Sequence, residues 1–461
     1  MSGSLRTIMQ SLALGTGLLA VAAQPSLTAD LPKATQAMLA KMKFDASILS
    51  GLDQELVMPP EWIAGAKNEG EVKILGSWDP RQFREMSAPF RERYPYVKLT
   101  YVRGGRLDRS IKALIALQQG RYLGHIITSP GEEWLDFKDE GALADLRVLP
   151  NFKTLPEESR EREGLWVGQK MAFRCMAYNT DKIKKSDLPR TWDDLITNPV
   201  WRNGTLAMSD RPNLWLSMLW VSNGPAWTTD FMEKLFRDVK PQLRKEGSSA
   251  SVGLTVAGET PAVIGAAEYR VKEYEIKGAP VSWHCPEPIP VAISQMIMLK
   301  GTPSPNGAYM FLNWFLSKEG QIAQYAGDFS APVHKDLYKD AHFYPYPEEV
   351  IGRKLAFRDE EKLRVEYPKL LAVYAPLWVG AGGGEAEGNT LLGELSAKES
   401  DGRALSLKLH NKVQATKVSP SRTEFFVNSK KSGWSALEVG MVCEVSFNAR
   451  ADEAAKVECE N

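Results

Sequence analysis

The chain has 461 residues, more than one hydrophobic core usually organises, so two or three domains are expected. With 43% hydrophobic and 25% charged residues, its composition is that of a globular protein rather than a disordered or fibrous one. The 57 basic and 57 acidic side chains leave a formal net charge of zero. This balance gives no sign of the basic excess that nucleic-acid or anionic-membrane partners usually require.

The N-terminus predicts export. Arg6 is the only charged residue before Asp30, and an apolar run over 12–23 lies between them, followed by small residues. The run is shorter than the ~20 apolar residues of a membrane-spanning helix, so residues 1–29 are predicted to be a signal peptide, cleaved after Ala23 or Ala29. An uncleaved anchor or a buried helix is the alternative. We expect a mature protein that is soluble and periplasmic.

Residues 30–170 predict an N-terminal arm followed by an α/β unit. The arm, 30–69, holds a helix over 34–42 and a second one that starts at Pro60 and stops at Gly70. Residues 70–170 then alternate short apolar strands at 72–75, 97–102 and 126–127 with helices at 83–94 and 107–119. Such alternation implies a mainly parallel sheet covered on both faces, here called lobe one.

A second α/β unit, lobe two, is predicted over 171–285. Its expected elements are a strand at 171–178, a helix at 229–243 and a strand at 281–285. Residues 286–380 then return to lobe one with a strand at 293–299 and helices over 306–325. The fold class is therefore α/β with two lobes. Ligands of open α/β sheets lie beyond the carboxyl ends of the strands, so a cleft between the lobes is the expected site.

The C-terminal region has a different pattern. The glycine-rich stretch 381–389 predicts a flexible linker. After it the apolar period changes from helical spacing to two, as in Leu405, Leu407 and Leu409, and Asp401-Gly402 is typical of a hairpin turn. Residues 390–461 therefore predict a separate all-β domain, a small barrel or curled sheet of about five strands.

The four cysteines fit an oxidising compartment, and none forms a CxxC pair. A hairpin centred on Ala451 places Val445 opposite Val457 and Cys443 opposite Cys459, which brings the Cβ atoms to disulfide range. A one-residue slip in register would put the two sulfurs on opposite faces. Cys175 and Cys285 lie on strands that approach the expected hinge, so a second disulfide is plausible between them.

Three segments of lobe one are candidate ligand-binding loops. Ser77, Trp78 and Asp79 lie between a strand and a helix, where free N–H groups and a hydroxyl suit an anionic or polar ligand. Arg103 and Gly104 offer a guanidinium group and open backbone, and arginine binds carboxylate or phosphate in bidentate fashion. Thr128 and Ser129 end the third strand. For Ser77, Asp79, Thr128 and Ser129 simple helix capping is the alternative, and for Arg103 a solvated side chain.

Several segments in order resemble the iron(III)-type periplasmic solute-binding proteins of ABC transporters. They are Tyr94-Pro-Tyr-Val-Lys-Leu-Thr-Tyr-Val-Arg-Gly104, Leu188-Pro-Arg-Thr-Trp-Asp-Asp-Leu195 with Pro199-Val-Trp-Arg-Asn-Gly204, and Phe311-Leu-Asn-Trp-Phe-Leu-Ser-Lys-Glu-Gly-Gln321. The resemblance covers roughly residues 60–380 and implies the two-lobed type-2 periplasmic-binding-protein fold. The tail is similar, more weakly, to a small bacterial β-barrel module, through Phe425-Phe-Val-Asn428 and Leu437-Glu-Val-Gly-Met-Val442.

The resemblance implies binding rather than chemistry, a monomer, and an ABC transporter permease as the partner. It also implies that Ser209, Asp210, Tyr269 and Arg270 lie in ligand loops of lobe two. Relatives that bind ferric iron typically use adjacent tyrosines near this place, whereas here Tyr269 is followed by Arg270. Phenolate oxygens suit a hard cation, but a neighbouring arginine favours an anion. We therefore expect a small anionic or polar ligand, with ferric ion as the alternative.

Two other classes of function stay open. The first is an enzyme on the same fold with Cys175 as nucleophile, although no nearby base is evident. The second is an interaction protein whose C-terminal domain binds a partner; ligand binding that survives deletion of 390–461 would argue against it. No cofactor is expected, because phosphate-binding loops and dinucleotide fingerprints are absent from the sequence. His284 lacks a partner at metal-ligand spacing, so it is expected to be structural and no metal site is predicted.

Overall fold

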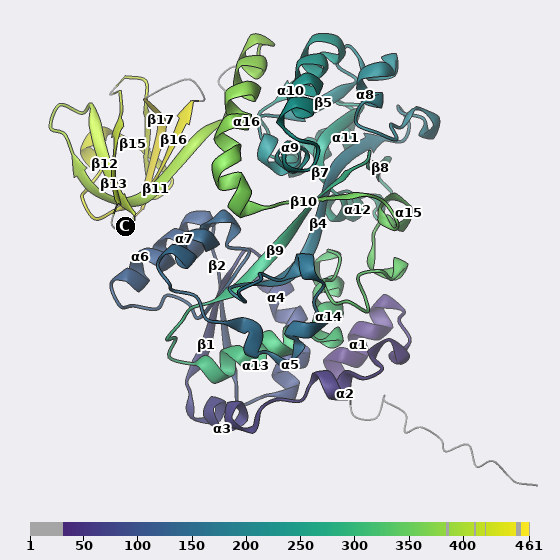
Figure 1. The fold of residues 1–461 in the computed structure, drawn as a ribbon, viewed down its shortest axis with the longest axis vertical. Coiled ribbons are helices and arrows are strands. Elements are labelled where there is room, and N and C mark those ends of the chain that lie inside the picture. The colour runs from purple at the N-terminus through teal and green to yellow at the C-terminus, as the bar shows by residue number, and fades with distance from the viewer. Residues whose placement is uncertain (1–30, 384–386, 410–411, 420, 449–452, 461) are drawn as a thin grey trace, which may run out of the picture.

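The computed structural model describes residues 31–383, 387–409, 412–419, 421–448 and 453–460, so the predicted signal peptide lies outside the described residues. Its helices and strands alternate between residues 60 and 357 (Figure 1). The α-helices are α1 (Lys33–Met42), α2 (Leu52–Glu55), α3 (Pro60–Asn68), α4 (Pro80–Met86), α5 (Ala88–Arg93), α6 (Lys112–Gln118), α7 (Trp134–Asp139), α8 (Asp194–Thr197), α9 (Leu216–Asn223), α10 (Pro225–Lys234), α11 (Ser248–Ala257), α12 (Glu268–Glu275), α13 (Pro305–Phe315), α14 (Lys318–Asp328), α15 (Pro347–Val350) and α16 (Glu360–Gly380).

The strands form two separate sheets. The first contains β1 (Glu71–Gly76), β2 (Lys98–Arg103), β3 (Ile126–Thr128), β4 (Val167–Asn179), β5 (Leu206–Ser209), β6 (Gln242–Arg244), β7 (Ala262–Ala267), β8 (Val281–His284), β9 (Ile289–Met298) and β10 (Leu355–Phe357), with the main order β2-β1-β3-β9-β4-β7-β5-β6. The second contains β11 (Glu387–Lys398), β12 (Ala404–Leu409), β13 (Lys412–Lys417), β14 (Glu424–Val427), β15 (Lys430–Ser432), β16 (Val442–Asn448) and β17 (Ala454–Glu460).

The first sheet is shared by both lobes, and β4 is the strand that crosses between them. Its first half pairs antiparallel with β9 as far as Phe173, and its second half pairs antiparallel with β7 from Arg174 onward. Strand β1 pairs parallel with β2 and β3, and β5 pairs parallel with β6 and β7, whereas β3 pairs antiparallel with β9 and β8 pairs antiparallel with β4. The predicted two-lobed α/β fold is confirmed, but the sheet is mixed rather than mainly parallel, because the strands that join the lobes, β4 and β9, run antiparallel to each other and to β7 and β3.

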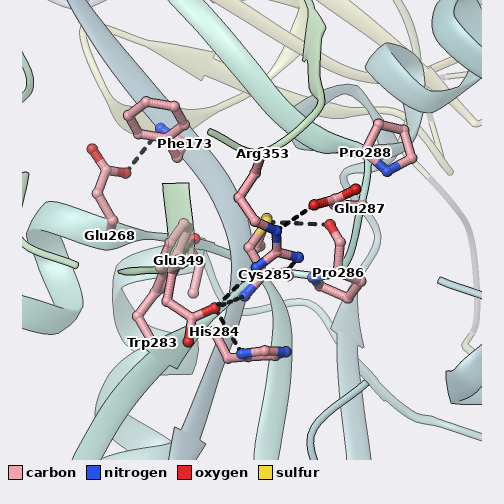
Figure 2. The surroundings of a disulfide bond; sticks show 12 residues. Phe173, Glu268, Trp283, His284, Cys285, Pro286, Glu287, Pro288, Glu349 and Arg353 are labelled. Atoms are coloured by element: carbon pink, nitrogen blue, oxygen red, sulfur yellow. Dashed lines mark hydrogen bonds and ion pairs between the residues drawn. A yellow bond between two sulfur atoms is a disulfide. The ribbon is translucent and has the colours of Figure 1, made fainter. Parts of the chain in front are cut away.

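A disulfide closes the crossing region. Cys175 on β4 is bonded to Cys285, which lies between β8 and β9, with their Cα atoms 5.1 Å apart. Figure 2 shows the polar groups around it: the Arg353 guanidinium donates to the carbonyl of Cys285, and Glu349 accepts from the backbone N–H of Cys285. The expected pairing of Cys175 with Cys285 is therefore confirmed, and it joins the strand that crosses between the lobes to the segment that leads back.

Two predicted helices differ from the structure. The helix expected over 83–94 is divided into α4 and α5 at Ser87, because Pro89 cannot supply a backbone N–H at the second position of α5. The helix expected over 229–243 starts earlier, as α10, and continues only through a π-helical turn, Leu235–Val239. Lys240 then adopts a left-handed conformation and Pro241 follows, so Leu243 lies in β6 instead.

The N-terminal arm packs on lobe one through a buried carboxylate. Glu319, on α14, accepts hydrogen bonds from Thr35 of α1, from Arg93 of α5 and from the indole N–H of Trp314. The side chain is fully buried, so its charge depends on these three donors. The arm is therefore an integral part of lobe one rather than a mobile extension.

The C-terminal domain is a seven-stranded sheet, larger than the predicted five, with β13 and β15 at its two ends. An isolated bridge from Lys417 to Glu453 brings β13 back to the start of β17, so the sheet curls. The predicted hairpin register is confirmed: β16 and β17 place Val445 opposite Val457 and Cys443 opposite Cys459. The two cysteines form a disulfide with their Cα atoms 4.1 Å apart. Because β11 begins at Glu387, the connection from α16 is shorter than the expected 381–389.

The Cys443–Cys459 disulfide is expected to stabilise the C-terminal domain. It closes a loop with a sequence separation of 16, and a loop of that length adds about 3 kcal/mol by restricting the unfolded chain. Scanning calorimetry of the double variant Cys443→Ala/Cys459→Ala should show the unfolding transition of this domain at lower temperature. The transition of the two-lobed body, which keeps its own disulfide, serves as the internal control and should move less. An unchanged transition of the C-terminal domain would contradict the prediction.

Candidate functional site

One of the predicted lobe-one loops contacts a buried carboxylate, Asp328, at the end of α14. Its Oδ2 accepts a hydrogen bond of 3.2 Å from the indole N–H of Trp78 and forms an ion pair of 2.6 Å with Lys170 of β4. Its Oδ1 accepts from Gln324 and from the backbone N–H of Ser330. Trp78 is thus a structural partner of a charged pair, and neither Lys170 nor Asp328 was predicted.

The neighbours of Trp78 are exposed. Asp79 forms a capping box at the start of α4: its side chain accepts from the backbone N–H of Arg81, and Gln82 binds back to the backbone N–H of Asp79. This is the capping role that the sequence left open. Asp79 also lies 3.5 Å from Arg103, and both side chains are more than half exposed. Ser77 is exposed as well.

Gly104 and the end of β3 are joined by Arg109, a residue that the sequence analysis missed. Its guanidinium donates to the carbonyl of Ser129 at 2.9 Å and to the carbonyl of Gly104 at 3.2 Å. A Cβ atom at Gly104 would lie 2.7 Å from the side chain of Asp108, so this position has no room for a larger residue. Arg109 therefore fixes two candidate loops to each other.

Thr128 and Ser129 have polar atoms directed into the protein. The Thr128 hydroxyl is buried without a hydrogen-bond partner, whereas the Ser129 hydroxyl donates to Gln169 at 3.0 Å. Ser129 has a φ of 51°, unusual for a residue with a side chain, and its N–H donates to the carbonyl of Gln295. Buried unpartnered polar groups and backbone strain both gather at functional sites.

In lobe two, Ser209 and Asp210 end β5. The carbonyl of Ser209 accepts from the buried hydroxyl of Tyr374, on α16. One carboxylate oxygen of Asp210 is buried without a partner, and burial raises the pKa of this group. Asn213, four residues after Ser209, also carries a buried unpartnered side-chain oxygen. This loop therefore presents hydrogen-bond acceptors.

Tyr269 and Arg270 begin α12, and they contact lobe one. The Nζ atom of Lys170 lies 5.3 Å from the centroid of the Tyr269 ring, and the Cζ atom of Arg270 lies 5.9 Å from it. Both cations are within the range of a cation–π interaction. Since Lys170 is held by Asp328, this contact joins the Trp78–Asp328–Lys170 group of lobe one to the Tyr269–Arg270 pair of lobe two. These are the predicted residues that the structure brings together.

Glu268 connects the same loop to the crossing strand. One of its carboxylate oxygens accepts a hydrogen bond of 2.9 Å from the backbone N–H of Phe173, and the other is buried without a partner (Figure 2). Burial raises the pKa of Glu268 to about 7, although the charge of Arg174 opposes this shift. The residue therefore lies where β4 passes from one lobe to the other.

A cluster of potential metal ligands lies outside the candidate loops. Glu55, His334 and Asp336 place ligand atoms within 4.8 Å of one another. The Nδ1 atom of His334 accepts from the backbone N–H of Asp336, so Nε2 carries the proton and a metal ion at Nε2 would require the other tautomer. Lys318 also lies 3.4 Å from Asp336. The cluster is therefore better suited to hydrogen bonding than to a metal.

Cys175 does not offer a nucleophile, because it is buried and disulfide-bonded. His284, expected to be structural, contacts the carbonyl of Pro189 at 2.7 Å and the carboxylate of Glu349 at 2.8 Å. None of the helices in the described parts of the chain combines the length and the apolar character needed to cross a bilayer.

Glu268 predicts a specific pH dependence of stability. Its ordinary pKa of 4.5 lies below the folded value of about 7, so the folded chain keeps a proton that the unfolded chain releases in between. The stabilisation is complete below pH 4.5 and is lost as the pH rises through 7. Glu268→Gln removes this dependence, so the variant should gain about 3 kcal/mol relative to the wild type over this window. Urea unfolding between pH 4 and 8 measures the difference; parallel stability curves would contradict it.

Comparisons with known proteins agree with this architecture. The sequence model of the family described as bacterial extracellular solute-binding protein matches residues 77–322, which is more than half of the chain. Several solved structures share the fold. Iron-bound HitA from Pseudomonas aeruginosa is 18% identical with a TM-score of 0.53, over 67% of this chain and 99% of that one.

Two further structures match over 68% of this chain. A putative extracellular solute-binding protein from Bordetella parapertussis is 18% identical with a TM-score of 0.56, covered to 98% of its length. The Trichodesmium protein IdiA (FutA), in complex with iron and citrate, is 19% identical with a TM-score of 0.54, covered to 99%. At these identities the likeness shows the two-lobed fold. The family match, which covers more than half of the chain, shows that this chain belongs to the bacterial extracellular solute-binding proteins.

Proposed function

We propose that the protein is the periplasmic binding component of an ABC importer, and that it captures a small anionic solute between its lobes. The observation that carries the proposal is the position of Tyr269 between two cations, Lys170 from lobe one and Arg270 from its own helix. Lys170 forms an ion pair with Asp328 and Arg270 forms one with Glu273, so an anionic group of the ligand would share these two cations with the carboxylates.

The same charges argue against a ferric ion held by protein groups alone. A phenolate ligand to a hard cation would place that cation close to the Lys170 ammonium group, which is held in place by its 2.6 Å ion pair with Asp328. The structures from P. aeruginosa and Trichodesmium contain iron, the second one with citrate. Iron with a carboxylate-bearing partner is accordingly the second candidate, since the anion would meet the two cations.

Ligand capture is expected to follow the usual order of steps in a protein whose two lobes are joined by crossing strands. The ligand first binds one lobe and then bridges to the other, and hinge closure at β4 removes it from water. The closed shape is what a transporter permease would recognise. Gly104 and Asp79 are expected to determine the conformation of their loops. The residues expected to contact the ligand are Ser77, Arg103, Thr128, Ser129, Ser209, Asp210, Tyr269 and Arg270. We assign Trp78 the role of hydrogen-bond donor to Asp328 rather than a role in ligand contact.

Thermal unfolding of residues 30–461 with a panel of ligands tests the proposal. Phosphate, an alkylphosphonate, a dicarboxylate and ferric citrate should be compared. A ligand at 100 times its dissociation constant adds about 2.7 kcal/mol, which raises the melting temperature by several degrees. We expect stabilisation by an iron-free anion that is lost in Arg270→Ala or Arg103→Ala.

Arg237→Ala is the matched control, because this exposed arginine of lobe two pairs only with the adjacent Asp238. It should keep the full ligand response. Stabilisation by ferric citrate but by none of the iron-free anions, lost in Tyr269→Phe, would replace the anion proposal with the iron one. A response that persists in all the site variants would show that the ligand binds elsewhere.

A further inference from the structure

Helix α16 lies on lobe two but begins in contact with lobe one. Its Tyr374 ring packs edge-on against Phe236, and the Tyr374 hydroxyl donates to the carbonyl of Ser209 at 2.9 Å. Trp220 of α9 donates to Glu366. Tyr374 and Trp378 are fully buried, so the body of the helix is fixed to lobe two. In Figure 1 α16 stands beside α9 and α10.

The first turn of α16 reaches across to α7 of lobe one. Arg364 forms ion pairs of 2.6 Å with Asp136 and 2.9 Å with Asp139, and Lys138 forms one of 2.7 Å with Glu361. Here these three contacts are called the ionic latch. Their side chains are partly exposed, with 43% of Arg364 and 27% of Lys138 accessible, so each pair is weak and sensitive to salt. A contact of this kind can break and re-form.

The far end of α16 leads into the C-terminal domain, which packs back on lobe one. Val442 of β16 and Leu392 of β11 meet Leu107, Ile111 and Ile115, on the π-helical turn Leu107–Ile111 and α6. We call this contact the apolar seam. Lys112 adds an ion pair of 2.6 Å with Glu460. The turn follows directly on the candidate ligand loop at Arg103 and Gly104, so the domain supports the helix that begins there.

We propose that α16 and the C-terminal domain form a clasp that holds the two lobes at the spacing seen here. The body of α16 is packed on lobe two. The first turn of the helix is joined to lobe one by the ionic latch, and the domain that follows the helix is joined to lobe one by the apolar seam. Opening of the hinge must separate α7 from α16 or detach the domain. The clasp therefore favours the interlobe spacing seen here, and it requires only the two-lobed fold, not the identity of the ligand.

The interlobe distance measures the clasp directly. Spin labels are attached through Arg81→Cys on lobe one and Arg237→Cys on lobe two, both at exposed positions. The four native cysteines are all disulfide-bonded and do not take the label. Distance distributions are recorded on the full mature chain by double electron–electron resonance, without ligand. The variants are Arg364→Ala/Lys138→Ala for the latch and Val442→Asp for the seam.

We expect each variant to gain a population at longer interlobe distance, and the combined variant to gain more than either alone. Raising NaCl from 0.15 to 1 M shortens the screening length from about 8 to about 3 Å, so it should lengthen the distance in the wild type but leave the latch variant unchanged. Arg147→Ala, which removes an ion pair of 2.6 Å with Asp145 inside lobe one, is the control.

Identical distributions for the wild type and the latch variant, with no response of the wild type to salt, would overturn the proposal. So would the same lengthening in Arg147→Ala. Circular dichroism establishes that each variant is folded; if the latch variant is not, the salt series on the unmutated clasp decides the question. A ligand panel that fails while the salt response is present would reject the proposed ligand class and leave the clasp standing.

Discussion

The architecture depends on one strand that belongs to both lobes. Because β4 pairs with β9 up to Phe173 and with β7 from Arg174, the two lobes are halves of a single sheet. A strand in continuous pairing resists bending more than a free linker does, and the Cys175–Cys285 disulfide fixes it to the segment that enters β9. Motion between the lobes is therefore confined to a short stretch of β4 and its neighbours.

The crossing strand also determines where two buried ionisable groups, Lys170 and Glu268, lie. Lys170 is three residues before Phe173 on β4, and Glu268 accepts a hydrogen bond from the Phe173 N–H, so both ionisable groups lie at the crossing. Burying charges there is costly unless each has a partner. Lys170 has Asp328, whereas Glu268 has only a backbone N–H at one oxygen, and the result is a raised pKa. At the crossing, one buried ionisable group therefore has a charged partner and the other has a raised pKa. Perturbed pKa values of this kind cluster at functional sites.

The sequence predicted what local patterns determine. Period-two alternation and one turn were sufficient to set the register of Cys443 against Cys459, and alternating strands and helices were sufficient for the two lobes. The partners of Asp328 were not predictable in this way: Lys170 is 158 residues away along the chain, and no periodicity connects them. The helix predicted over 229–243 failed because apolar spacing continued to Leu243, while backbone conformation at Lys240 and Pro241 had already ended it. Local sequence patterns predict individual helices and strands, whereas contacts between loops that are distant in the sequence become visible only in the folded structure.

The C-terminal extension changes how the two-lobed fold should be understood. In a protein with lobes joined only at the hinge, the equilibrium between open and closed forms depends on the crossing strands and on the ligand. Here α16 is buried on lobe two at Tyr374 and Trp378, yet its first turn and the domain beyond it both contact lobe one. Any free energy in those contacts favours the interlobe spacing seen here before a ligand arrives, and it therefore enters the equilibrium on which the ligand acts. Because partly exposed ion pairs are weak, the lobes remain able to separate, whereas a stronger tie would hold them at one spacing.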